Sequence, residues 1–533
     1  MSTSSSQDLL HGLKLVCFVA ALFLAAFIQA LDFSIANVAI PSIAADFGIS
    51  THDGTWIITL FAVSLAISLA LTGWLVNQFG SRIVLIYATI AFTIASFLCG
   101  FAWSYDTLVI FRILQGATAG PLMALPQSMI SEYLPESYTR PCLSIILVGM
   151  VTAPILGPVL GGYITEEYGW RWVFYINVPF GLLSAFTAMN VLPTQILPKG
   201  KVPISYIGVM LLIIGMITQQ LFLDRGNQND WFDSSFIVTL GSIALVALIL
   251  FFAWDKYSEK PILHTECFAD LNFTIASLVL ASAMLMINGT LILVPLFTQT
   301  QLGYTPFLSG LAIMPLGILP LLIAPFMPMV MKKIDPRLLV SVGFLILAAA
   351  NFMMSHITPQ ASIWELMIPR FIQGAGVGFF VLPLQQLALL NISDELVTHA
   401  TTLFNFVRLT LGGGGLGTAL YITAWQRREA LHHSNLTELM TPLKEMTKQT
   451  YNVMKGYGLE DAKIAYALDF MVTKQAYTIA FDDLFWISAW AMLIAFPAIW
   501  LCKPYSSDDA VAIEPTLKSE VIIEQFGTII GNT

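Results

Sequence analysis

The chain of 533 residues contains about fourteen apolar stretches of roughly 20 residues each. A stretch of this length can cross a bilayer as one α-helix, whose backbone groups all find their hydrogen-bond partners inside the helix. The expected fold is therefore an all-α membrane protein. The expected spans are 15–40, 55–76, 83–102, 108–130, 141–165, 172–192, 204–223, 235–254, 272–297, 307–331, 338–357, 363–390, 399–423 and 482–502.

The composition agrees with a membrane protein and argues against several other classes. Hydrophobic residues make up 57% of the chain and charged residues 11%, whereas a soluble domain carries roughly twice that charged fraction. The net charge of −9 leaves no basic patch for a nucleic acid, and no zinc or P-loop spacing is present. We expect no enzyme activity, no cofactor, no metal and no nucleic-acid partner.

One short motif occurs twice inside apolar stretches. It reads Arg112-Ile-Leu-Gln115-Gly116 in the first copy and Arg370-Phe-Ile-Gln373-Gly374 in the second, about 258 residues later. An arginine in a membrane span costs at least a few kcal/mol, so it should face a protein interior or a wet cavity. The repeat of so costly a motif predicts two related halves around one central site, which is the plan of a secondary transporter.

The repeat divides the spans into six, two and six. An even number places both termini on one side, and with cytoplasmic termini twelve Lys/Arg lie in cytoplasmic segments against two in short outer loops. The expected parts are a cytoplasmic N-terminus 1–14, a six-helix bundle 15–192, an inserted helix pair with its loops 193–271, a second six-helix bundle 272–502 and a cytoplasmic tail 503–533.

The second bundle includes one long outer loop, 424–480. Apolar residues recur there at helical spacing in two runs, which Gly456 and Gly458 separate, so we expect two amphipathic helices outside the membrane. The loop could be a lid on the protein itself or a docking surface for a partner. His432 and His433 lie in it and make only a weak case for a metal site.

Asp32 is the carboxylate that we place deep inside a span, with Gln29 and Asn37 nearby on the same helix. Burial in a low dielectric favours the neutral form of a carboxylate, which lets it load and release a proton near neutral pH. The alternative is a structural ion pair or a polar contact at a helix end. Three other acidic residues, expected to be solvated or to cap helices, are Glu132, Asp224 and Glu365.

Glycine is concentrated in the fifth span of each half, and the first-half span also contains prolines. Small residues four apart let another helix approach closely, and prolines bend a helix. The first-half pattern is therefore either a packing ridge or a bend that gates the two halves. Its residues are Gly149, Pro154, Gly157, Pro158, Gly161 and Gly162.

In the second half, a run of four glycines at 412–415 indicates a hinge or a very close contact. Arg408 lies one turn before it and is the third arginine inside a span. Asn405 lies one further turn back on the same face.

Five segments of the chain, in order, match motifs of one family. They are 31–41 in the first span, the loop 73–82 with Gly73, Gly80 and Arg82, the fourth-span motif 112–116, the fifth-span motif 149–162, and 170–181. Together they resemble the major facilitator superfamily and, within it, the fourteen-helix drug:proton antiporters of the EmrB/QacA kind. The match covers nearly all of the chain.

The resemblance implies a proton-coupled exporter of hydrophobic toxic compounds that works by rocker-switch alternating access. It also implies that Asp32 is the main protonation site and that Arg112 adjusts its proton affinity or relays the coupling. Further polar residues expected at the substrate cavity are Gln29, Asn37, Gln115, Arg370, Gln373, Asn405 and Arg408.

The long outer loop is the feature most similar to the EmrB type. In such systems the pump works with a periplasmic membrane-fusion adaptor (EmrA-like) and an outer-membrane channel (TolC-like). The resemblance therefore implies those partners and a Gram-negative inner membrane. The chain departs from the family pattern at Asn77, where an acidic residue is usual, and at 204–208, which lacks an Asp often found there.

Two other functions stay open at this point. The first is import of a small solute by the same fold, against which the fifth-span motif and the shortage of buried charges weigh. The second is a membrane receptor or assembly protein that acts through the loop 424–480.

Overall fold

The computed structural model describes residues 12–193, 205–258, 261–393, 396–440 and 445–503. The described residues are helical and contain no strand, which confirms the all-α prediction. Thirteen helices among them are long and apolar enough to cross a membrane. The predicted segments 1–14, 193–271, 424–480 and 503–533 lie partly outside the described residues.

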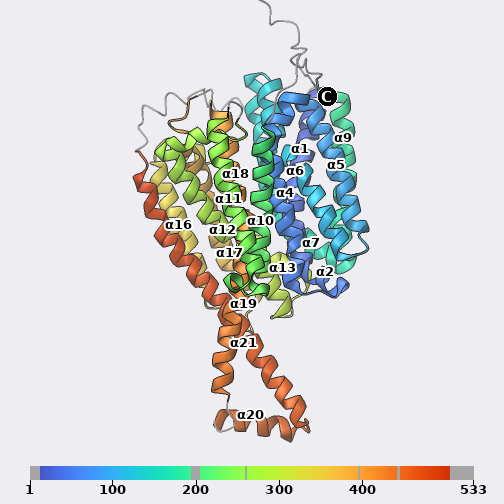
Figure 1. Cartoon of the computed structure of the whole chain (residues 1–533), viewed down its shortest axis with the longest axis vertical. Helices are drawn as coiled ribbons and strands as arrows, with labels where there is room; N and C mark the ends of the chain where they lie inside the picture. Colours follow the sequence, from blue (N-terminus) through green and yellow to red (C-terminus); the bar gives the residue numbers. More distant parts are fainter. Residues whose placement is uncertain (1–11, 194–204, 259–260, 394–395, 441–444, 504–533) are drawn as a thin grey trace, which may run out of the picture.

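The first six-helix bundle occupies one side of the molecule (Figure 1). Its first candidate span continues beyond the predicted end at residue 40, because a short 3₁₀ turn leads directly from α1 into another helix that ends at Phe47. The elements are α1 (Leu13–Ile35), η1 (Ala36–Ala39), α2 (Ile40–Phe47), α3 (Thr51–Gly54), α4 (Trp56–Phe79), α5 (Ser81–Phe101), α6 (Tyr105–Tyr133), α7 (Glu136–Glu167), α8 (Trp172–Tyr175) and α9 (Asn177–Val191).

An antiparallel helix pair follows, α10 (Tyr206–Gly226) and α11 (Ser235–Tyr257), joined by the 3₁₀ turns η2 (Asn227–Asn229) and η3 (Trp231–Asp233). The second six-helix bundle comes after the turn η4 (Thr265–Ala269). Its elements are α12 (Leu271–Thr300), α13 (Pro306–Ile313), α14 (Pro315–Ile323), α15 (Met327–Met331), α16 (Pro336–Met354), α17 (Ile363–Leu389), α18 (Val397–Thr410), α19 (Gly414–Leu439), α20 (Glu445–Gly456), α21 (Asp461–Ala495) and η5 (Phe496–Leu501).

The thirteenth predicted span, 399–423, is divided between α18 and α19 at residues 411–413. The glycine run breaks the helix there and also allows close packing on α12. A Cβ added to Gly412 or Gly417 would lie 2.7 Å from the carbonyl oxygen of Ala281 or Leu285, respectively. The predicted span 307–331 is likewise divided, because prolines stand in the first turn of α13, α14 and α15.

The two halves meet at the end of the molecule nearest α20. The glycines of α7 pack directly on backbone there, since a Cβ on Gly161 would meet Ile35 of α1 and a Cβ on Gly162 would meet Pro306. In return, a Cβ on Gly310 of α13 would meet the carbonyl of Pro158. The small residues of α7 therefore form a contact between the halves.

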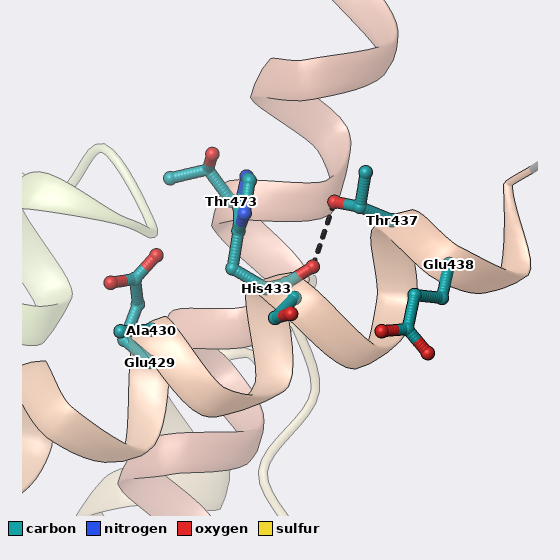
Figure 2. A pocket seen from close by; sticks show the side chains of 7 residues that line it. Glu429, Ala430, His433, Thr437, Glu438 and Thr473 are labelled. Carbon is teal, nitrogen blue, oxygen red and sulfur yellow. Dashed lines mark hydrogen bonds between the residues drawn. The ribbon is translucent and has the colours of Figure 1, made fainter.

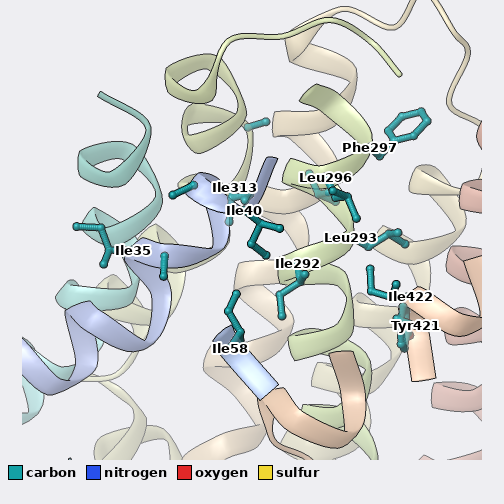
Figure 3. Close-up of a cluster of buried hydrophobic side chains, with 14 of the residues drawn as sticks. Ile35, Ile40, Ile58, Ile292, Leu293, Leu296, Phe297, Ile313, Tyr421 and Ile422 are labelled. Atoms are coloured by element: carbon teal, nitrogen blue, oxygen red, sulfur yellow. The ribbon is translucent and has the colours of Figure 1, made fainter. Parts of the chain in front are cut away.

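An apolar cluster seals the same end (Figure 3). Isoleucines from the first half, among them Ile40 and Ile58, face α12 and the start of α19 across the molecule. The labelled members are Ile35, Ile40, Ile58, Ile292, Leu293, Leu296, Phe297, Ile313, Tyr421 and Ile422, and each is less than one-tenth exposed.

The outer segment differs from the prediction. The described part of 424–480 is helical and breaks after Gly456 as predicted, but it does not consist of two helices separate from the bundle: α19 continues from the bundle to Leu439, and the last helix begins at Asp461 instead of 482. The short α20 joins these two extensions at the far tip of a triangular projection (Figure 1). The projection stands clear of the bundles, so it does not form a lid over them.

Candidate functional site

A buried ion pair lies inside the first bundle. Nη1 of Arg112, on α6, donates to Oδ2 of Asp32, on α1, at 2.6 Å, and neither residue is exposed. Oδ1 of the same carboxylate accepts hydrogen bonds from Gln115 at 2.9 Å and from Asn177 of α9 at 2.8 Å. Three donors from two helices therefore hold the charged form of Asp32.

The arginine is also held on its other sides. Its Nε donates to the carbonyl of Ile57 at 2.9 Å, and Nη1 also donates to Oε1 of Gln115 at 2.8 Å. The guanidinium lies 4.0 Å from the centre of the Phe61 ring and 5.5 Å from that of Phe174, both within the range of cation–π attraction. Arg112 would thus keep its position if the carboxylate lost its charge.

Asn177 and Ser96 complete the site and were missed as site residues. Asn177 donates to both Asp32 and the Ser96 hydroxyl, at 2.8 and 3.1 Å, and Ser96 donates to the carbonyl of Phe174 at 2.8 Å. Asn177 lies in the motif 170–181, but only the packing of α9 on α1 and α5 brings it to the carboxylate. The sequence offers only a lone amide in an apolar span, and the structure shows that this amide is fully buried.

The geometry fits both interpretations of Asp32. It is a structural ion pair, and it is also a carboxylate whose proton binding would compete with its pairing to Arg112. Taking two charges out of water is costly, and their attraction repays this cost only with further hydrogen bonds such as these. One bound proton would remove the ion pair and leave Arg112 to its neutral partners.

The two other candidates on the first helix are buried but apart from this network. Gln29, on α1, is 4% exposed and Asn37, in η1, is 6% exposed. Neither is a hydrogen-bond partner of Asp32 among the described contacts. The Oδ1 atom of Asn37 is buried without a hydrogen bond.

The second half repeats the site with one change. Nη1 of Arg370, on α17, donates to Oε1 of Gln373 at 2.7 Å and to the hydroxyl of Thr290, on α12, at 3.0 Å. Thr290 follows Asp32 by the same offset that relates Arg370 to Arg112. A hydroxyl therefore occupies the position that a carboxylate occupies in the first half.

This substitution leaves a buried cation without a counter-charge. Among the described residues Arg370 forms no ion pair, and its Nε and the Nε2 of Gln373 have no hydrogen bond, although the two side chains are 0% and 2% exposed. The second half thus carries a positive charge where the first half holds a neutral pair.

Asn405 and Arg408 lie on α18, before the glycine break. The Asn405 amide donates to the carbonyl of Thr401 in its own helix at 3.0 Å, and the Nε of Arg408 is buried without a hydrogen bond. The structure gives neither residue a hydrogen bond to Asp32 or Arg370. The predicted polar set is therefore divided into separate groups.

The loop motif 73–82 shapes the turn after α4. Gly80 ends the helix with φ of 85°, a conformation that favours glycine. Arg82 donates to the carbonyl of Met189 at 2.7 Å, which ties α5 to α9. Gly73 and Asn77 are exposed on α4.

The three acidic residues predicted at helix ends behave differently. Glu365 forms a capping box with Ser362, which confirms its capping role, and Glu132 is exposed near Ser81. The prediction for Asp224 is wrong. It is 3% exposed, because α10 packs on α4, where its Oδ2 accepts a hydrogen bond from Thr59 at 2.9 Å.

A cavity of about 570 Å³ lies where α19 and α21 leave the bundle. Glu429, His433, Thr437, Glu438 and Thr473 line it (Figure 2). Two histidines of α19 contact aspartates of α21: His433 contacts Asp469 at 3.2 Å, and His432 contacts Asp483. No group of three potential metal ligands occurs among the described residues.

The ion pair makes a prediction about stability. Arg112→Gln should lower the free energy of unfolding by about 3–5 kcal/mol, because it leaves an uncompensated buried carboxylate. The double variant with Asp32→Asn should lose less than the sum of the two single losses. Unfolding in detergent, measured for all four proteins of the cycle, gives the coupling; strict additivity would contradict the pairing.

Comparison with known proteins agrees with this architecture. The sequence matches the profile of the Major Facilitator Superfamily over residues 22–417. It is 37% identical to the fatty acid resistance protein FarB of Neisseria gonorrhoeae over 495 residues, covering 93% of this chain and 97% of that protein. It is also 37% identical to the multidrug export protein EmrB of Escherichia coli K12 over 499 residues, with the same coverage.

A solved structure shares the fold. The inward-facing, unoccupied form of a bacterial homologue of the human lysosomal transporter Spinster superposes with a TM-score of 0.58 at 16% identity, covering 95% of this chain and 99% of that one. The chain is therefore a member of the major facilitator superfamily, in its EmrB/QacA branch of transporters.

Proposed function

We propose that the protein is a proton-driven exporter of hydrophobic toxic compounds that works by alternating access. The observation that carries this proposal is the buried pair of Asp32 and Arg112, a proton-binding group held beside a fixed cation. The names of the 37%-identical relatives, which refer to fatty acid resistance and multidrug export, support the substrate class.

The site suggests how a proton could drive the cycle. Charged Asp32 draws α1, α6 and α9 together through Arg112, Gln115 and Asn177. A proton on Asp32 cancels the attraction and frees α1 to move relative to α6. One proton crossing a potential of about 100 mV releases about 2.3 kcal/mol, which supports a gradient of nearly two decades for a neutral substrate.

The projection of α19, α20 and α21 would be the docking surface for partners. It stands clear of the bundles and exposes large apolar side chains, including Val453, Tyr457, Tyr466 and Phe470. We propose a periplasmic membrane-fusion adaptor (EmrA-like), continued by an outer-membrane channel (TolC-like). We propose accordingly that the protein lies in a Gram-negative inner membrane with both termini in the cytoplasm; the positive-inside count supports this orientation.

The direct test is transport into inverted membrane vesicles that carry a respiration-driven proton gradient. The wild type should accumulate lipophilic compounds, and Asp32→Asn should abolish gradient-driven accumulation, because the site can no longer change charge. Asp46→Asn is the matched control, since Asp46 forms an exposed ion pair with Arg171 at 2.8 Å.

Gradient-driven accumulation by Asp32→Asn at the wild-type level would mean that a residue other than Asp32 couples transport to protons. Extrusion from inverted vesicles, the opposite direction, would indicate the importer. A complete lack of transport, with the protein verified in the membrane, would favour the receptor function.

The unpaired charge of Arg370 suggests how substrates are selected. We propose that Arg370 and Gln373 contact an anionic group of the substrate. Thr290→Asp would supply the missing carboxylate, so it should reduce transport of lipophilic weak acids at least roughly tenfold and leave lipophilic cations nearly unaffected. Uptake of both substrate types in the same vesicles checks this; an equal effect on both would show that Arg370 is only structural.

A further inference from the structure

Asp224 is a buried carboxylate that takes no part in the hydrogen-bond network of Asp32 and Arg112. It lies near the end of α10 and is 3% exposed. Its Oδ2 accepts from the Thr59 hydroxyl of α4 at 2.9 Å, and its Oδ1 accepts from Nε2 of Gln220 at 3.0 Å. Both donors are neutral, and no described ion pair includes Asp224.

The charged groups around Asp224 form no ion pair with it among the described residues, although Arg225 attracts it electrostatically. Arg225, its neighbour in α10, turns its guanidinium over the Trp56 ring at 4.4 Å. Tyr105 of α6 interacts electrostatically with Asp224 and with Asp53 of α3, and His52 of α3 interacts with Asp53 and Arg225. From the second half, Arg408 of α18 and Arg427 of α19 form no ion pair with it in the described structure, and Arg427 binds Asn227 instead, at 2.9 Å.

A cavity lies beside the helix turn that carries this carboxylate, because Arg225, the next residue of α10, belongs to its wall. This cavity of about 480 Å³ is lined by residues of the first half, of α10 and of η2. Trp56 and Arg225 belong to its wall, and the carboxylate-binding Thr59 lies one turn along α4 from Trp56. The full lining is Ile49, Asp53, Trp56, Tyr105, Asp106, Val109, Ile110, Arg225 and Gln228.

A second contact connects Asp224 to the broken helix of the other half. The Nε2 of Gln220 donates to Asp224 and also to the carbonyl oxygen of Gly415, at 3.3 Å. Gly415 stands in the first turn of α19, directly after the break at 411–413. One amide group therefore bridges a buried carboxylate in the inserted pair and the glycine hinge of the second half.

We infer that Asp224 is a second proton-binding site, loaded through the cavity at the α20 end, and that its charge controls the α18–α19 hinge through Gln220. Charged Asp224 holds the Gln220 amide against Gly415. A proton on Asp224 weakens that hold, so the hinge opens more often. The role of this hinge in transport rests on the proposed proton-driven cycle, but the test of the inference does not depend on that cycle.

The test is hydrogen–deuterium exchange of the purified full chain in bilayer nanodiscs, without substrate, at pH 5.5 and pH 8.0. After correction for intrinsic exchange, peptides covering 405–420 should exchange faster at the lower pH in the wild type, by at least roughly fivefold, the lower end of typical couplings between two sites. In the Asp224→Asn variant, the same peptides should exchange at the fast rate at both pH values. Asp32→Asn should keep the pH dependence.

Gln220→Leu is the second variant, because it leaves the carboxylate and removes the bridge to Gly415. It too should lose the pH dependence in 405–420. A pH response that persists in Asp224→Asn or in Gln220→Leu would overturn the inference. Because this readout needs neither substrate nor gradient, failed transport in vesicles with an intact pH response would count against the proposed function alone.

Discussion

The ion pair of Asp32 and Arg112 is the interaction on which the first half depends. An arginine inside a membrane is tolerated when a counter-charge and hydrogen bonds replace water. Here the counter-charge comes from α1, and further hydrogen bonds come from α4, α6 and α9. One charged pair therefore ties four elements of the bundle together, and a single proton can release it.

The second half shows what happens when the carboxylate is absent. Arg370 and Gln373 keep the geometry of the first copy, with Thr290 in the place of Asp32. The duplicated scaffold is thus used unequally: one half holds a neutral pair that a proton can break, and the other keeps an unpaired cation. In the proposed mechanism, this asymmetry separates a proton site from a substrate contact within one repeated framework.

Much of the fold could be predicted from the sequence, because a membrane span is recognised by length and apolar composition alone. The places where the prediction failed depend on contacts between distant segments. α21 begins at Asp461 because a helix can leave the membrane without a break, which hydropathy does not report. Asp224 stands near polar residues at a helix end, and only the packing of α10 on α4 buries it.

The candidate site was predicted in part. Asp32, Arg112 and Gln115 do meet, whereas Gln29 and Asn37 lie apart from them. Asn177 was missed because a lone amide in an apolar span gives no local pattern. Thr290 could have been found, since the repeat offset that pairs the two arginines also pairs it with Asp32.

The measurement that tests the central claim most directly is an infrared pH titration of the protein in bilayers, comparing wild type with Asp32→Asn. The account predicts a carboxylic-acid carbonyl band that appears in the wild type as the pH falls and is missing from the variant, together with loss of the matching carboxylate band. Identical difference spectra for the two proteins across the titration would show that Asp32 does not exchange a proton, and would contradict the account.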